Sequence, residues 1–179
     1  MHIGVPREIK PLEGRVGLIP AACSGLVSAG HAVYIESGAG AQSGYSDEAY
    51  RAAGAQITAN AAELYEQGQL IVKVKEPLEG DLRYLRSDHI LFSYLHLAAN
   101  PALTRNLCSI GLTALAFETV QLASGELPLL APMSDIAGRL SVHLGANLLH
   151  QPQGGKGLLL GGLAGAERGR VTVIGGGTA

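Results

Sequence analysis

Two cations, an imidazole and a carboxylate follow four apolar runs of this sequence. They are Arg15, Lys75, His96 and Glu118. Short apolar runs bounded by turn signals predict buried β-strands. If those strands are parallel neighbours, the four side chains meet at the carboxyl edge of one sheet, where open α/β sheets bind ligands. These residue types bind anions and transfer protons, so the edge is the candidate site.

Each residue alone also has a structural explanation. Arg15 could be a solvated loop charge, and Lys75 could be an edge-strand lysine that discourages aggregation. His96 could be a hydrogen-bonded structural histidine. Cys23 and Cys108 are expected to be small core residues. Only the conjunction of the charged residues at one edge favours a functional site.

Strand-like and helix-like segments alternate and must position these side chains. The predicted strands span residues 3–6, 31–36, 70–75, 90–96, 112–117 and 171–174. The predicted helices span 20–30, 78–85, 100–111 and 134–150, and two more begin at Ser46 and Asn60. A hairpin turn is expected at Ser124-Gly125. The alternation predicts an α/β, Rossmann-like fold with a largely parallel sheet flanked by helices.

Side chains alternate along a strand, so Val72 and Val74 are expected on one face of the run 70–75. Lys73 and Lys75 are then expected together on the other face. The ammonium of Lys75 would stand at the carboxyl end of this strand.

The chain ends on a glycine turn after the apolar run 171–174. Gly175 and Gly177 have the spacing that opens a dinucleotide fingerprint, in which glycines let a pyrophosphate approach the backbone closely. The third glycine of the motif would be residue 180. The acidic residue that contacts the ribose lies about 20 positions further on, outside this sequence.

Composition excludes several classes of function. The 179 residues carry 13 basic and 15 acidic side chains, a net charge of −2, which argues against nucleic acid and anionic membranes as partners. No apolar run is long enough to cross a membrane, and the N-terminus lacks the basic region of a signal peptide. Two cysteines without CxxC spacing support neither a disulfide framework nor a metal site. A cytoplasmic protein is expected.

Several blocks resemble one enzyme family at matching spacing from residue 1 to residue 179. They are Gly4-Val5-Pro6-Arg7-Glu8, Glu13-x-Arg15-Val16, Lys73-Val74-Lys75-Glu76-Pro77, Leu95-His96-Leu97-Ala98, Glu118-Thr119-Val120 and Leu129-Leu130-Ala131-Pro132-Met133-Ser134. The chain resembles the alanine dehydrogenase/pyridine nucleotide transhydrogenase family. His96 favours the dehydrogenase branch, because the transhydrogenases lack a histidine there. The resemblance implies NAD-dependent, reversible oxidative deamination of L-alanine to pyruvate and ammonia, by a homo-oligomer that is hexameric.

The resemblance also implies residue roles. Arg15 and Lys75 would bind the substrate carboxylate, and His96 would be the catalytic acid and base. NAD would be held by Ser134 and by the glycine turn. The turn residues concerned are Gly175, Gly177, Thr178 and Ala179.

The sequence is about half as long as such enzymes. We expect residues 1–130 to be the N-terminal part of the substrate domain, residues 131–170 a connecting helix and glycine-rich segment, and residues 171–179 the truncated start of a Rossmann NAD-binding domain. A second catalytic acid is expected outside this chain, so the fragment alone should be inactive. Two alternatives stay open: a transhydrogenase α-subunit-type domain, and a non-catalytic module that binds small acids or assembles with itself.

Overall fold

The structure is a computed structural model that describes residues 1–166 and 168–179. The chain divides into two compact units, Met1–Thr119 and Val120–Ala179. Each unit is described by itself below.

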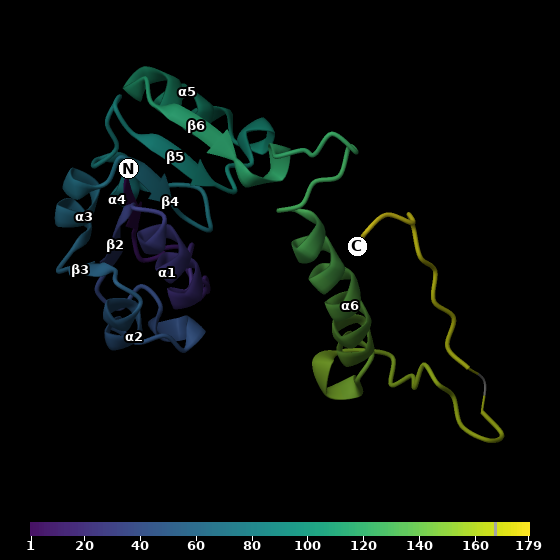
Figure 1. The fold of residues 1–179 in the computed structure, drawn as a ribbon. Helices are drawn as coiled ribbons and strands as arrows, with labels where there is room; N and C mark the ends of the chain where they lie inside the picture. The colour runs from purple at the N-terminus through teal and green to yellow at the C-terminus, as the bar shows by residue number, and fades with distance from the viewer. Residues whose placement is uncertain (167) are drawn as a thin grey trace. The chain divides into compact units, whose positions relative to one another are not determined.

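The first unit is built on a six-stranded parallel sheet (Figure 1). Its strands are β1 (His2–Val5), β2 (Ala32–Glu36), β3 (Gln56–Thr58), β4 (Leu70–Val72), β5 (Ile90–Ser93) and β6 (Thr113–Ala116). Their order in the sheet is β3-β2-β1-β4-β5-β6, the doubly wound order of Rossmann folds. The predicted fold class is confirmed, although β3 was not predicted and β4 and β5 end earlier than expected.

The first unit contains five α-helices, and three of them begin at a side-chain cap that the sequence predicts. The five helices are α1 (Pro20–Ser28), α2 (Asp47–Ala52), α3 (Ala61–Gln67), α4 (Glu79–Leu82) and α5 (Pro101–Ile110). The side chains of Ser46, Asn60 and Asn100 each accept a hydrogen bond from a backbone N–H three residues later, at 3.3, 3.0 and 3.1 Å. These bonds satisfy N–H groups that the first turn of a helix leaves without partners.

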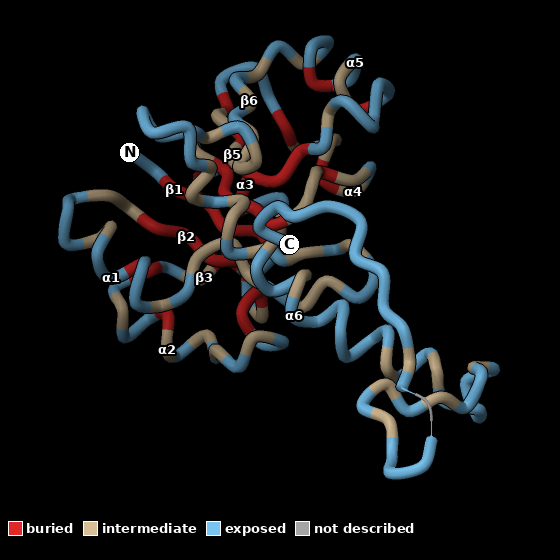
Figure 2. Tube along the Cα trace, turned by 90° about the vertical axis from the view of Figure 1, so that its right-hand side faces the viewer, coloured by how far each residue is buried: buried red, intermediate tan, exposed pale blue. Residues whose placement is uncertain are grey.

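Apolar side chains pack on both faces of the sheet, as strands buried on both faces require. One core joins the sheet to α1 and α2; it contains Ile3, Val5, Cys23, Val33, Ile35, Ala39, Tyr50, Ala55 and Val72. The other joins the sheet to α3, α4 and α5; it contains Leu64, Tyr65, Ile71, Leu85, Leu91, Leu95, Leu103 and Leu107. Figure 2 shows this burial concentrated along the strands of the first unit. Cys23 is buried as predicted, whereas Cys108 is exposed on α5.

The second unit contains one long helix, α6 (Ala131–Leu148), close to the predicted helix 134–150. Before it, the N–H of Leu122 donates to the carbonyl of Glu126 at 2.9 Å, so the turn at Ser124-Gly125 exists, but no strands flank it. Residues 171–174 are not a strand, which corrects the sequence prediction. Within the described residues, no neighbouring strand pairs with them to satisfy their backbone groups. None of the helices described is long and apolar enough to span a bilayer.

Candidate functional site

The candidate site lies at the carboxyl ends of the strands, around the point where the strand order reverses. Arg15 follows β1, and Lys75 follows β4, which is paired with β1 in the sheet. From β1 the chain continues to β2 on one side, and from β4 it continues to β5 on the other. Loops that diverge in this way leave a crevice between them, which is where open α/β sheets bind ligands.

The loop that carries Arg15 is fixed by a carboxylate and by a close backbone approach. Arg15 donates from Nε to Oε1 of Glu13 at 2.8 Å and from Nη2 to Oε2 at 2.7 Å. The side-chain hydrogen bond from Arg15 lowers the pKa of Glu13. Two residues later, a Cβ on Gly17 would lie 2.8 Å from the carbonyl oxygen of Val72. Gly17 therefore lets the Arg15 loop pass directly over the end of β4.

Lys73 and Lys75 do not share an environment, contrary to the alternation predicted for a strand over 70–75. Lys73 is 1% exposed, and its Nζ lies 3.5 Å from Oε2 of Glu8 and 3.4 Å from Oδ2 of Asp81. Lys75 is half-buried beyond the end of β4, and its ammonium forms no ion pair in the part of the chain that the structure describes. Its charge helps to lower the pKa of Glu13, a smaller effect than that of the Arg15 hydrogen bond. Lys75 is thus the cation that a ligand can use.

The carboxylate of Glu8 connects the buried charges to the segment that carries Lys75. Its Oε1 accepts a hydrogen bond from the backbone N–H of Val74 at 2.7 Å. Burial raises the pKa of Glu8, and the charge of Lys73 opposes this effect. The hydroxyl of Tyr65 donates to Oδ1 of Asp81 at 3.0 Å, on the far side of the same lysine. The buried charges are therefore paired and hydrogen-bonded, as burial requires.

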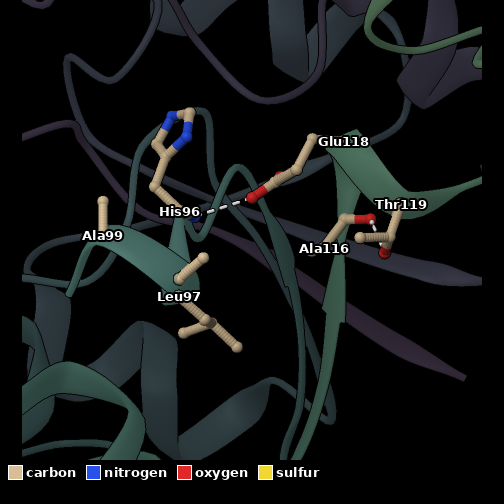
Figure 3. A pocket seen from close by; sticks show the side chains of 7 residues that line it. His96, Leu97, Ala99, Ala116, Glu118 and Thr119 are labelled. Carbon is tan, nitrogen blue, oxygen red and sulfur yellow. Dashed lines mark hydrogen bonds between the residues drawn. The ribbon is translucent and has the colours of Figure 1, made fainter. Parts of the chain in front are cut away.

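His96 lies beyond the end of β5, on an exposed turn beside a cavity of about 330 Å³. The cavity is lined by His96, Leu97, Ala98, Ala99, Ala116, Glu118 and Thr119 (Figure 3). The imidazole stacks on the ring of Tyr94, with centroids 6.2 Å apart and planes at 12°. The backbone of His96 is left-handed, with φ of 49°, and its N–H donates to Oε1 of Glu118 at 2.6 Å.

The structure brings the predicted substrate residues to one edge of the sheet without joining them in one described cavity. Burial raises the pKa of Tyr94, and the charge of Arg15 opposes that shift, so Tyr94 connects the environment of Arg15 to that of His96. The charges of Arg15 and Lys75 both lower the pKa of Glu13, so Glu13 lies close to both cations. Neither Arg15 nor Lys75, however, lines the cavity beside His96.

The predicted cofactor residues all lie in the second unit. Ser134 is in the first turns of α6, and its backbone N–H donates to the carbonyl of Leu130 at 3.1 Å. Gly175 has φ of 102°, which side chains rarely adopt. A Cβ on Gly138 would lie 2.6 Å from the carbonyl carbon of Ala179. The glycine turn therefore ends against α6, one helical turn after Ser134.

Sequence reasoning assigned no role to the acidic residues that hold these loops. Lys73 is paired with Glu8 and Asp81, and Arg15 is paired with Glu13. The sequence pattern predicted that Glu118 lies at this edge, but it did not predict the hydrogen bond from His96. One signal was available, because a lysine inside the apolar run 70–74 requires a buried carboxylate. No group of three or more His, Cys, Asp or Glu side chains in the described residues is placed to hold a metal ion.

Comparisons with known proteins agree with this arrangement. Residues 4–137 match the family described as Alanine dehydrogenase/PNT, N-terminal domain, and residues 141–179 match Alanine dehydrogenase/PNT, C-terminal domain. The alanine dehydrogenase of Methanococcus maripaludis is 52% identical over 177 residues, which are 99% of this chain and 48% of that protein. That of Geobacillus stearothermophilus is 51% identical over 179 residues, 100% of this chain and 48% of that protein.

Solved structures give the same result. An L-alanine dehydrogenase superposes with a TM-score of 0.90 and 51% identity, over 99% of this chain and 49% of that one. A transhydrogenase from Sinorhizobium meliloti is more distant, with a TM-score of 0.73 and 26% identity over 82% of this chain and 44% of that one. The chain spans about half the length of the curated relatives that it matches. On the match over residues 4–137, the chain belongs to the alanine dehydrogenase/PNT family.

Proposed function

We propose that the protein to which this chain belongs is an NAD-dependent alanine dehydrogenase, which converts L-alanine reversibly to pyruvate and ammonia. The observation that carries the proposal is the placement of Arg15, Lys75 and His96 on three loops at one edge of the sheet. The relatives at about 50% identity are named alanine dehydrogenase, which supports this substrate. The transhydrogenase alternative is less favoured at 26% identity.

Arg15 and Lys75 bind the substrate carboxylate in this proposal. The guanidinium of Arg15 is a planar fork that matches the two oxygens of a carboxylate, and Glu13 fixes its orientation. Lys75 adds a compact second cation from the neighbouring loop. Lys73 has no part in binding, because it is 1% exposed and enclosed with Glu8 and Asp81, out of reach of a ligand.

His96 transfers protons in this proposal. An imidazole nitrogen takes a proton from the ammonium group of alanine as the imine forms, and releases it to solvent. It then takes a proton from the water that adds to the imine carbon and gives it to the nitrogen that leaves as ammonia. The hydroxyl proton is taken up as the carbonyl group of pyruvate forms. Its exposure beside the cavity leaves room for that water. In the direction of amination the same nitrogen moves these protons in reverse.

The second unit supplies part of a dinucleotide site in this proposal. The close approach of Ala179 to Gly138, and the left-handed Gly175, fit a backbone turn that receives a pyrophosphate. Ser134 would add a hydroxyl, and Gly177 and Thr178 would complete the turn. When bound, NAD supplies the hydride acceptor for the Cα hydrogen of alanine.

We also propose domain boundaries near residues 130 and 170, a cytoplasmic location and a homohexameric assembly for the complete protein. The two cysteines, both free thiols, support a reducing compartment such as the cytoplasm.

Replacing His96 by alanine in the complete enzyme tests the proposed function. Because general acid–base catalysis contributes about 10²- to 10⁴-fold, kcat for alanine oxidation should fall by that factor while KM changes little. His31→Ala, before β2 at the opposite edge of the sheet, is the matched control and should leave kcat unchanged. A kcat that survives His96→Ala would assign His96 to structure.

The 179-residue chain should not catalyse by itself, and it should bind NAD at most weakly. A dinucleotide site needs a βαβ unit of about 30 residues, with a helix N-terminus at the pyrophosphate and an acid at the ribose. Calorimetric titration of this chain with NAD checks the expectation. Micromolar affinity would show that the cofactor site is misplaced.

A further inference from the structure

We infer that Glu118 is the positioning residue that holds His96 in its left-handed conformation, and that its carboxylate is required for catalysis although it bonds to the backbone of His96. The inference rests on the proposed function of His96. It concerns a residue that follows β6, the neighbour of β5 in the sheet.

The register of the sheet brings Glu118 level with this turn. Ser93 of β5 pairs with Ala116 of β6, so two residues further along each chain Leu95 stands beside Glu118. The N–H of Leu95 donates to Oε1 and Oε2 of Glu118 at 3.2 and 3.3 Å. The N–H of His96 donates to Oε1 at 2.6 Å.

Two consecutive backbone N–H groups therefore converge on one carboxylate. Such a concavity favours an anion, because both dipoles point at the same place. Hydrogen bonds to an ionised acceptor are shorter and about twice as strong as neutral ones. In this turn the protein itself supplies the anion, Glu118.

The backbone of His96 needs this support. A non-glycine residue at φ of 49° is strained and persists only where its surroundings determine it. The left-handed residue turns the chain out of the line of β5 into the short 3₁₀ helix η2 (Leu97–Ala99). It also sets the direction of the imidazole, which stacks on Tyr94. In Figure 3 the hydrogen bond that Glu118 accepts comes from the backbone N–H of His96 and not from its ring.

A glutamine at position 118 would remove the negative charge and one acceptor oxygen while preserving the volume of the side chain. The N–H of His96 would then donate to a neutral acceptor, and the NH₂ group that replaces Oε2 would face the N–H of Leu95. An aspartate would keep the charge and fall short by one methylene. The two substitutions separate the need for charge from the need for reach.

The test compares Glu118→Gln with Glu63→Gln in the complete enzyme. Glu63 is a matched control, because its Oε2 also accepts a backbone N–H, that of Ala59 at 2.9 Å, on α3 away from the site. Glu118→Gln should lower kcat by about tenfold or more, since misplacing a catalytic group by about 1 Å costs up to about 100-fold. KM should change less than about threefold, as expected when only transition-state stabilisation is lost. Glu63→Gln should leave both constants unchanged, and Glu118→Asp should recover part of kcat.

A double-mutant cycle shows whether Glu118 acts through His96. In the His96→Ala background, Glu118→Gln should lower kcat no further than about twofold. An equal loss of kcat in both backgrounds would overturn the inference, as would equal losses in Glu118→Gln and Glu63→Gln.

A crystal structure of Glu118→Gln distinguishes failure of this inference from failure of the proposed function. The φ angle of His96 should leave the left-handed region, and an unchanged φ would overturn the inference. If His96→Ala alone leaves kcat intact, the proposed function of His96 fails, whatever the backbone of the Glu118 variant does.

Discussion

Lys73 and Lys75 stand two residues apart at the end of β4, and in the part of the chain that the structure describes only Lys73 of the two forms ion pairs with carboxylates. Lys73 is 1% exposed between Glu8 and Asp81. Lys75 is half-buried beyond the end of β4, and its ammonium has no ion-pair partner among residues 1–166 and 168–179. The same residue type therefore stabilises the fold at one position and is available to a ligand at the other.

In the complete enzyme, alanine at position 73 should lower stability, whereas alanine at position 75 should weaken substrate binding. Lys73→Ala leaves two buried carboxylates without a cation and should lower the free energy of unfolding by about 3–5 kcal/mol. Lys75→Ala should change it by less than about 0.5 kcal/mol and should raise KM for alanine. Urea denaturation and steady-state kinetics measure both. Equal losses of stability in the two variants would contradict the distinction.

Arg15→Lys tests whether the planar fork matters. A lysine keeps the charge but loses the two parallel bonds to a carboxylate and the bonds that Glu13 accepts. KM for alanine and pyruvate should rise by about 10- to 100-fold, the equivalent of one hydrogen bond to a charged group. Arg51→Lys on α2, which disturbs an exposed pair with Glu48, is the control. If both variants raise KM alike, Arg15 does not bind the substrate.

The left-handed backbone of His96 predicts an unusual order of stabilities. Both His96→Ala and His96→Gly remove the imidazole, but only glycine adopts φ of 49° without strain. His96→Gly should be more stable than His96→Ala by about 1 kcal/mol, measured by thermal unfolding. At Ala29, where φ is −80°, a change to glycine should instead destabilise. A less stable His96→Gly variant would show that the turn relaxes on substitution.

Protonation of Asp47 should lower the free energy of unfolding in acid. Hydrogen bonds from the N–H of Gly38 at 2.8 Å and the hydroxyl of Ser37 at 2.7 Å, in that order of effect, lower the pKa of Asp47 from 3.8. Because the folded pKa lies below the unfolded value, this stabilisation is complete above about pH 3.8 and is lost as the pH falls through the folded pKa.

Asp47→Asn should lower the free energy of unfolding by about 1 kcal/mol at pH 7, after screening by solvent, and by much less at pH 3. Denaturation at the two pH values measures the difference. Asp135→Asn, which removes an exposed pair with Arg139 on α6, should cost less than about 0.5 kcal/mol at pH 7. A loss for Asp47→Asn that does not depend on pH would contradict the prediction.

Helix positions were predictable because their signals are local. Pro20 begins α1, Asn100 caps α5, and Gly111 ends it with φ of 80°. Strand ends were less predictable, because pairing depends on distant segments. The run 70–75 forms a strand only to Val72, the last residue in register with β5, although the N–H of Tyr94 still donates to the carbonyl of Val74 at 3.1 Å. The run 171–174 forms none, because in the described residues it has no neighbour.

The sequence placed Glu118 with the basic residues at this edge of the sheet, but it gave Glu118 no partner and gave Glu8, Glu13 and Asp81 no role. Arg15, Lys75 and His96 follow strands, and parallel strands bring such residues to one edge. The partners Glu13 and Glu118 act through bonds whose geometry depends on loop conformation and on register. A histidine in the sequence does not by itself specify a left-handed backbone, so the strain at His96 is evident only from the structure.

The parallel strands leave a second rim, at their amino ends, that carries none of the site residues. The turns there contain Gly30, Gly68 and Gly111, and a side chain at Gly30 would meet open space, although its φ of 85° disfavours one. Met1 begins at the same rim, beside β1. A fluorophore or a surface tether fixed near Ala29 would therefore face away from the ligand, so immobilised-protein binding measurements can be made without obstructing the crevice.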